Sequence, residues 1–308
     1  MTNITSPLPN RLLPQALLLV LCAFLLGQTA HADLEAARRN MSQTDNPLLM
    51  MKTSRGDIYM ELFPDAAPAN VANFIALAEG RADVTDPVSG QSLNIPWYDG
   101  LRFHRVIPGT LIQAGAPRDE NSPRPDYHIA DEINAQQLGL NLIPVFDELN
   151  RPHPWLNIGN KADLEQELLI PLYRREGINN EQTLAAREFE ILAKLQAMNL
   201  LQAYQQQGYR YSNRLVSLRP LRGSVVMANS GPDTNQTEFF ITVTDTPWLT
   251  GRNTVIGQVV DGLLIADRIL AAAGNTSNPA FAATTIYEIR QVLNPTTTTN
   301  GLIPARPR

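Results

Sequence analysis

The chain has 308 residues, among them 25 lysines and arginines, 30 aspartates and glutamates and a single cysteine. All 30 acidic residues and 24 of the basic residues follow residue 32, which gives that part of the chain a net charge of −6. Because no stripe of lysine or arginine runs through it, we do not expect it to bind nucleic acid. The position of the cysteine, Cys22, excludes disulfides and thiolate metal sites downstream.

The first 32 residues have the pattern of a secretory signal peptide. An apolar run at 16–27 follows Arg11, and Ala30-His31-Ala32 forms a small-x-small signal, so cleavage is predicted between Ala32 and Asp33. The run is shorter than the roughly 20 residues of a membrane-spanning helix, although an uncleaved anchor is the alternative. We therefore expect a periplasmic protein without a membrane segment after cleavage.

Alternating apolar residues predict a β-hairpin near the start of the mature chain, with strands at 49–54 and 57–62 around a glycine turn. Residues 68–78 predict a short amphipathic helix, because Pro68 suits its first turn and apolar residues recur at helical spacing. Residues 81–97 show no clear period and predict an exposed loop.

Two further strands are predicted at 101–107 and 111–115, and one more at 127–133. Beyond residue 138 the alternation stops, which predicts a helical insertion at 138–217. Within the insertion, a short helix is predicted at 161–170 and a longer one at 183–207. The apolar residues of the longer helix gather on one side: Leu184, Ile191, Leu192, Leu195 and Met198.

The sheet pattern then resumes in predicted strands at 224–228, 238–244, 254–260 and 286–293, with one helix at 263–271. Many short strands with two isolated helices predict a mainly-β fold, a closed antiparallel barrel of about eight strands capped by two helices. The barrel would be built from residues 47–137 and 218–293, on either side of the insertion. A tail at 294–308, rich in threonine and proline, is predicted to be disordered.

Two motifs carry the strongest indication of function. The run FHRVIPG at 103–109 stands just before Leu111-Ile112-Gln113, and MANSGPDTNQTEFFI occupies 227–241. In this order they resemble the cyclophilins, a barrel family of peptidyl-prolyl isomerases, and the resemblance covers about 48–133 and 218–293. It implies a cyclophilin-like barrel that isomerises Xaa-Pro bonds, with proline-containing segments of unfolded or exported proteins as partners.

The resemblance places Arg105 where the family has an arginine that contacts substrate. Rotation about a prolyl amide is slow because resonance gives the C–N bond partial double-bond character, with a barrier near ~20 kcal/mol. A guanidinium donating toward the prolyl nitrogen would stabilise the twisted amide more than the planar one. Neither a cofactor nor a metal ion is then required.

Strand alternation indicates which residues share a face with this arginine. Leu111 and Gln113 point to one side of their strand and Ile112 to the other, while Glu238 and Phe240 share one side of theirs. These outward sets match the substrate cleft of the family.

By resemblance, Leu111, Phe240 and Leu249 would line the pocket for the proline ring, and Trp248 would form its rim. On composition alone, Phe240 and Leu249 would more often be core residues, and Trp248 fits packing between a loop and the barrel equally well. The predicted substrate-binding set is Thr110, Leu111, Gln113, Ala228, Asn229, Glu238, Phe240, Trp248, Leu249 and Asn253.

Three residues depart from the family: Thr110 replaces the usual phenylalanine, Asn253 a histidine or tyrosine, and Glu238 a glutamine. Losing an aromatic wall would cost about 1 to 2 kcal/mol of contact, about ten- to thirtyfold in efficiency. Glu238 would in addition hold Arg105 in an ion pair that competes with substrate. These departures leave open a second hypothesis, a binding module or chaperone with little turnover, and a third, an envelope-assembly scaffold.

The remaining candidates for chemistry are weaker. His104, His128 and His153 lack the paired spacing of a metal site, and structural or surface roles are expected for them. The acidic pairs at 131–132 and 147–148 have no partner motif and are expected to be solvated.

Overall fold

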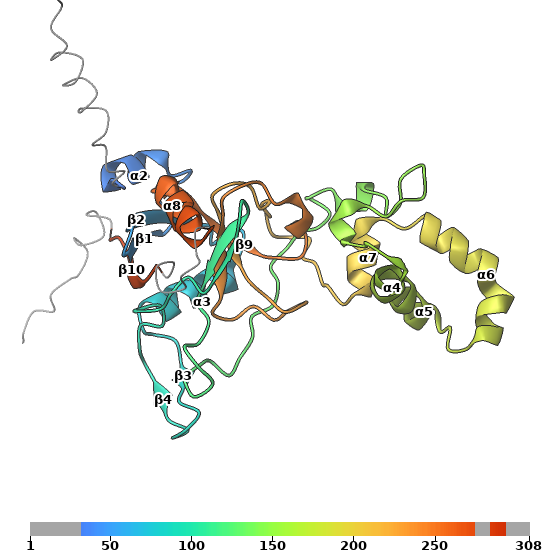
Figure 1. Ribbon diagram of the computed structural model, residues 1–308, viewed down its shortest axis with the longest axis horizontal. Helices are drawn as coiled ribbons and strands as arrows, with labels where there is room; N and C mark the ends of the chain where they lie inside the picture. Colours follow the sequence, from blue (N-terminus) through green and yellow to red (C-terminus); the bar gives the residue numbers. More distant parts are fainter. Residues whose placement is uncertain (1–31, 275–283, 294–308) are drawn as a thin grey trace, which may run out of the picture.

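The computed structural model of the chain describes residues 32–274 and 284–293 (Figure 1). The predicted tail at 294–308 and the predicted signal peptide up to residue 31 lie outside the described residues. Figure 1 shows a body of strands at one end and the helices of the insertion at the other.

The body is one eight-stranded antiparallel sheet with the order β10-β1-β2-β9-β7-β8-β6-β5. Each strand lies within or close to a predicted segment, because alternating apolar residues mark strands that bury one face. The strands are β1 (Leu48–Thr53), β2 (Gly56–Leu62), β5 (Arg105–Ile107), β6 (Leu111–Ala114), β7 (Ser224–Met227), β8 (Phe239–Thr242), β9 (Val255–Asp261) and β10 (Ile286–Gln291).

The structure is a curled sheet and not the expected closed barrel, because the edge strands β10 and β5 do not form a ladder with each other. One isolated bridge, Arg102 to Thr285, joins the segment before β5 to the segment before β10. Backbone hydrogen bonds support it, from the nitrogen of Phe103 to the oxygen of Thr284 at 3.1 Å and from Ile286 to Leu101 at 2.8 Å. The strand predicted at 101–107 is shorter for this reason, since its first residues bond toward β10.

The core lies inside the curl and is covered by the two predicted helices, α3 (Pro68–Ala78) and α8 (Leu263–Gly274). Helix α3 packs against β10, and α8 packs against β2, β5 and β6. Phe74 of α3 forms an aromatic cluster with Tyr98 and Phe239, with ring centroids 5.0 to 5.4 Å apart. The two contacts of Phe239 are edge-to-face and all three rings are fully buried, which fixes the side of β8 that faces inward.

A short helix and a pair of short strands were not predicted. Helix α2 (Leu34–Asn40) begins at Asp33, whose side chain accepts a hydrogen bond from the Glu35 nitrogen, and packs on β2 and β9. The predicted loop at 81–97 contains the short strands β3 (Val84–Thr85) and β4 (Ser92–Leu93), which pair with each other. Conversely, the predicted strand at 127–133 is wrong, because a single bridge from Ile129 to Asn235 is all that pairs there.

The insertion at 138–217 has a hydrophobic cluster of its own, which includes Leu140, Leu168, Leu172 and Tyr204. Its helical segments are η1 (Leu140–Leu142), η2 (Pro154–Leu156), α4 (Lys161–Leu164), the π-helical turn η3 (Glu165–Leu169), α5 (Ile170–Glu176), α6 (Glu181–Gln196) and α7 (Leu200–Gln206).

The single helix predicted at 183–207 is wrong, because the chain breaks between α6 and α7. Asn199 starts α7 with a capping box: its side chain accepts from the nitrogen of Gln202, and the Gln202 side chain accepts from the nitrogen of Asn199, both at 3.0 Å. The helix predicted at 161–170 continues instead to Glu176, with Pro171 in the first turn of α5, where its missing N–H is tolerated.

Candidate active site

The outer face of the sheet brings the predicted catalytic arginine beside the predicted pocket. Arg105 of β5 lies opposite Gln113 of β6, and Gln113 lies opposite Phe240 of β8. Their neighbours Ile112 and Phe239 point inward and belong to the core. Strand alternation therefore places Arg105, Gln113 and Phe240 on one surface, as the sequence indicates.

A chain of polar contacts holds the guanidinium. Nη1 of Arg105 donates to Oε1 of Gln113 at 3.0 Å, and Nε2 of Gln113 donates to Oε2 of Glu238 at 2.6 Å. Nε2 of His104 lies 3.2 Å from the same carboxylate oxygen. The expected ion pair between Arg105 and Glu238 is not formed within the described residues, because Gln113 stands between them.

Glu238 is an anion fixed by its neighbours. The hydrogen bond from His104 does most to hold the pKa of Glu238 below its ordinary value, partial burial opposes it, and Gln113 and the charge of Arg105 add to the lowering. His104 is a site residue that the sequence reasoning missed. It precedes β5 and lies outside the ladder, so strand alternation does not fix where its side chain points.

An apolar cluster lies on the same outer face. Leu249 and Trp248 come from the short helix η4 (Pro247–Leu249) after β8, and Trp248 is 41% exposed beside the cluster. The three residues predicted for the proline pocket thus meet in one place. The cluster contains buried Leu111, Val226, Phe240 and Val255, with Ile107, Ala228 and Leu249 packed against them.

Two of the three departures from the family motif bond to nearby backbone. Oγ1 of Thr110 donates to the oxygen of Pro108 at 3.3 Å, and Nδ2 of Asn253 donates to the oxygen of Met227 at 3.1 Å. Neither side chain supplies an aromatic wall beside the apolar cluster. The weaker contact with a proline ring expected from these departures stays a prediction.

The last two predicted contact residues, Ala228 and Asn229, line a hollow of about 320 Å³ together with Gln113 and Glu238. The hollow lies on the outer face, beside the polar contacts of Gln113 and Glu238. The amide of Asn229 donates to the backbone oxygen of Arg252 at 2.9 Å, so its side chain is bonded to the loop at 247–253. A bound peptide would therefore contact the backbone of Asn229.

Comparison with known proteins identifies the family of the chain. The family model described as cyclophilin type peptidyl-prolyl cis-trans isomerase/CLD matches residues 48–291. The chain belongs to this isomerase family. The curated peptidyl-prolyl cis-trans isomerase B of Streptomyces anulatus is 28% identical over 227 residues, which are 73% of this chain and 84% of that protein. The probable isomerase A of Mycobacterium bovis is 28% identical over 240 residues, 77% of this chain and 87% of that protein.

Among solved structures, a cyclophilin-type isomerase of Cryptosporidium parvum is similar, with 19% sequence identity and a TM-score of 0.44 over 81% of this chain and 99% of that one. In the described part of the chain, no helix is both long and apolar enough to cross a membrane. No group of three potential ligand side chains gathers around a metal position within the same residues.

The acidic pair at 131–132 has structural roles in this cyclophilin, which corrects the expectation that it is solvated. Asp131 accepts hydrogen bonds from the nitrogen of Asp233 at 2.9 Å and from Nδ2 of Asn235 at 3.0 Å, and burial raises its pKa. Glu132 accepts from the first-turn nitrogens of α3, at Ala69 and Asn70. The bonds of Asp131 hold the loop after β7 and those of Glu132 hold the start of α3, so the segment predicted as a strand at 127–133 is fixed by side-chain contacts instead of a ladder.

The insertion supports the loop at 247–253, which carries Trp248, Leu249 and Asn253. The guanidinium of Arg252 lies 4.6 Å from the ring centroid of Tyr204, and the hydroxyl of Tyr211 donates to the oxygen of Gly251 at 2.8 Å. Leu140 packs so closely that a Cβ at position 251 would come within 2.3 Å of it. Helices η2 and η4 also contact each other. One side of the pocket is thus held by residues outside the barrel.

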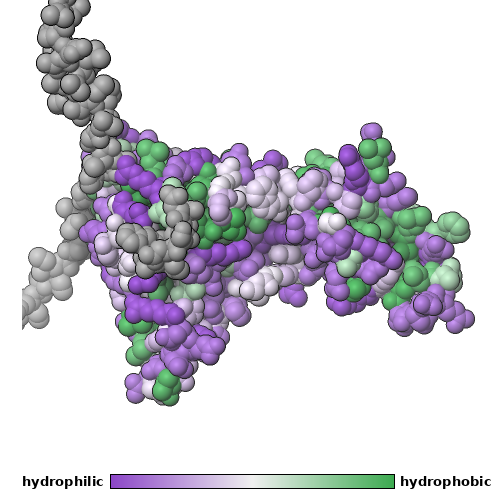
Figure 2. Space-filling view, viewed as in Figure 1, coloured by the Kyte–Doolittle hydropathy of each residue, from purple (hydrophilic) through white to green (hydrophobic). Residues whose placement is uncertain are grey.

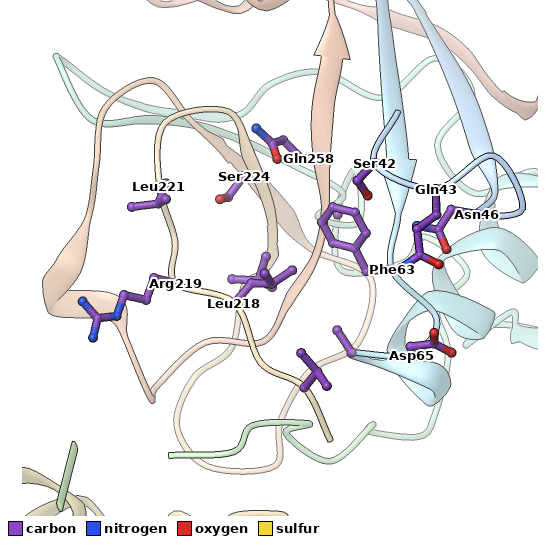
Figure 3. Close-up of a pocket in the computed structure, with 14 residues that line it drawn as sticks. Ser42, Gln43, Asn46, Phe63, Asp65, Leu218, Arg219, Leu221, Ser224 and Gln258 are labelled. Atoms are coloured by element: carbon purple, nitrogen blue, oxygen red, sulfur yellow. The ribbon is translucent and has the colours of Figure 1, made fainter. Parts of the chain in front are cut away.

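A separate pocket of about 370 Å³ lies away from the polar chain (Figure 3). Its walls come from the segments at 42–46, 63–66 and 216–221 and from Ser224 of β7 and Val255, Gly257 and Gln258 of β9. Figure 3 shows Phe63 near the centre, with Asp65 and Arg219 on opposite sides. It contains none of the predicted site residues. We assign it no part in the isomerase site.

Proposed function

We propose that the chain catalyses cis-trans isomerisation of Xaa-Pro bonds in exported or unfolded proteins in the periplasm, with Arg105 as its catalytic residue. One observation carries this proposal. An exposed guanidinium, held on one side by Gln113, lies on the same face as an outward apolar cluster that contains Phe240.

The chemistry follows from that juxtaposition. The proline ring would rest on Leu111, Phe240 and Leu249, which removes apolar surface from water and fixes the ring while the preceding residue turns. As the amide twists, the lone pair of the prolyl nitrogen localises, and Arg105 donates a hydrogen bond toward it. Because this bond is stronger in the twisted state, it lowers the barrier of ~20 kcal/mol.

The test is isomerisation of a short Xaa-Pro peptide by the mature protein. We expect Arg105→Ala to lower kcat/KM by about 10²-fold, the usual cost of removing one donor aimed at the transition state. Arg105→Lys keeps the charge but loses the planar fork, and should recover little. Arg268→Ala removes an exposed arginine on α8 and should change nothing. Equal rates for wild type and Arg105→Ala would overturn the proposal.

The periplasmic part of the proposal has support from the start of α2. The backbone nitrogen of Asp33 donates to Oδ2 of Asp261 at 2.5 Å. Cleavage after Ala32 would turn this nitrogen into an ammonium group beside a carboxylate, an exposed ion pair of up to about 1 kcal/mol. Intact mass and fractionation of the expressed full chain test this: we expect a periplasmic product that starts at Asp33. A full-length product in the cytoplasm would contradict it.

The rival proposal, a cyclophilin-like binding module with little turnover, is supported by Thr110, which stands where the family motif usually has a phenylalanine. The same peptide assay separates the two. A wild-type rate at the uncatalysed value, with retained binding of a proline peptide, would favour the rival.

A further inference from the structure

The insertion carries an apolar groove about 400 Å³ in volume between α5 and α6, far along the chain from Arg105. Figure 2 shows hydrophobic residues gathered at this end of the molecule. The groove is lined by Leu169, Tyr173, Glu181, Leu184, Ala185, Glu188, Ile191, Leu192 and Leu195.

Ion pairs fix α6 to the end of α5 along the arc of α6 that borders the groove. Arg187 and Lys194 both pair with Glu176 at the end of α5, at 3.2 and 2.5 Å, and Arg187 also pairs with Glu190 at 2.7 Å. At 100° per residue, these positions occupy one arc of the helix and the groove residues occupy the next. The ion pairs therefore set how far α6 stands from α5.

The apolar face of α6 is wider than the surface it buries. Ile191 is buried, but Leu192 next to it is 47% exposed and Phe189 is 87% exposed. A helix in a globular protein normally turns an apolar stripe of this width into the core. Contiguous exposed apolar surface on a protein is a mark of an interaction site.

The two charged residues that line the groove are both carboxylates. Glu181 and Glu188 form no ion pair within the described residues. The other acidic residues of α5 and α6, Glu176 and Glu190, do pair with cations. Glu181 and Glu188 are seven residues apart on one face, so two helical turns, about 10 Å, separate them. A partner that matches this groove has an apolar surface and two positive charges about 10 Å apart.

We propose that the groove between α5 and α6 is a docking site for an amphipathic helix of a client protein, with lysine or arginine two turns apart beside its leucine-rich face. This is the helix-in-groove mode of peptide recognition. It is independent of proline, so the protein would hold a client at the insertion while the barrel meets the client's Xaa-Pro bonds. Tethering raises the effective concentration of those bonds at Arg105.

Binding of a fluorescein-labelled 14-residue helix of leucine, alanine and lysine, without proline and with lysines at i and i+7, tests the proposal by anisotropy. We expect Phe189→Ser with Leu192→Ser to abolish binding, and Glu181→Gln with Glu188→Gln to weaken it about tenfold at low salt. Because these side chains line the groove or the surface, folding should be preserved, as circular dichroism would show.

Matched controls come from another loop of the insertion. Glu148→Gln and Leu149→Ser remove an equally exposed carboxylate and apolar side chain and should leave binding unchanged. Isomerisation of a short Xaa-Pro peptide should be the same in all variants, so failure here is distinct from failure of the isomerase proposal. Absence of binding, or equal binding of a scrambled or glutamate-substituted peptide, would overturn the proposal. So would a wild-type dimer that the Phe189 and Leu192 changes dissolve, since the face would then join two copies of this chain.

Discussion

Gln113 is predicted to act by positioning Arg105, and Gln113→Leu tests this. Leucine is similar in size and suits the apolar cluster beside it, but it removes the acceptor 3.0 Å from Nη1 of Arg105 and the donor 2.6 Å from Glu238. A hydrogen bond to a charged group contributes about 1.5 to 3 kcal/mol. Because the guanidinium is exposed, we use the lower end, and about 1.4 kcal/mol corresponds to a tenfold loss in kcat/KM.

A second consequence strengthens the effect. Without Gln113 between them, Arg105 and Glu238 are free to approach each other, and the ion pair expected from the sequence would then compete with substrate. We therefore expect a ten- to thirtyfold loss in kcat/KM for the Xaa-Pro peptide, with the fold retained by circular dichroism.

A double-mutant cycle decides whether the loss passes through Arg105. If Gln113 works by holding the guanidinium, Gln113→Leu should have little effect once Arg105→Ala is present, since the group it positions is gone. An equal loss in both backgrounds would refute this reasoning and assign Gln113 a direct contact with substrate. Gln258→Leu, an exposed glutamine on β9, serves as the control.

Three further predictions concern stability and the pocket. Because the pKa of Glu238 is lowered in the folded protein, its stabilising contribution should be complete above the unfolded carboxyl pKa and disappear as pH falls through the folded value. Wild type and Glu238→Gln should therefore differ in Tm at pH 7 and converge once the pH lies below the lowered pKa of Glu238. Glu61 is buried and accepts bonds from both the nitrogen and the hydroxyl of Ser42, so Glu61→Gln should lower Tm by about 5 to 10 °C, whereas an unchanged Tm would contradict the role of these bonds. Tyr211→Phe removes the bond to Gly251 and should raise KM for the prolyl peptide about fivefold with folding intact, and an unchanged KM would show that the loop holds itself.

The strands and the pair of barrel helices follow from the sequence because their signals are local. Alternation at β6 fixes which way Leu111 and Gln113 point, and Pro68 marks the start of α3. Contacts between residues far apart in the sequence cannot be predicted in this way. Glu132 caps a helix 62 residues earlier at Asn70, and nothing near it in the sequence announces that partner.

The polar contacts at the site also divide into those that the sequence predicts and those that it does not. Arg105 and Gln113 were expected in one cleft from the resemblance to the family, and their pairing across β5 and β6 places them on one face. Glu238 and His104 lie just outside their strands, where periodicity no longer fixes direction, so the predicted contact of Glu238 with Arg105 was wrong and its contact with His104 was missed. The break before Asn199 was missed because good helix formers flank it, and a capping box competes with them.

The contacts between insertion and barrel determine how the two roles can be separated. Removing residues 140–217 would take away Leu140, Tyr204 and Tyr211, which pack on or bond to the loop that carries Trp248 and Leu249. Loss of isomerase activity in such a deletion would therefore report on the pocket rim as well as on any lost client site. Substitutions on the exposed face of α6 leave those contacts intact, because Tyr204 and Tyr211 belong to α7 and the segment after it. A variant of α6 that no longer binds the helix but still isomerises the Xaa-Pro peptide would show that client binding and isomerisation use different surfaces of the protein.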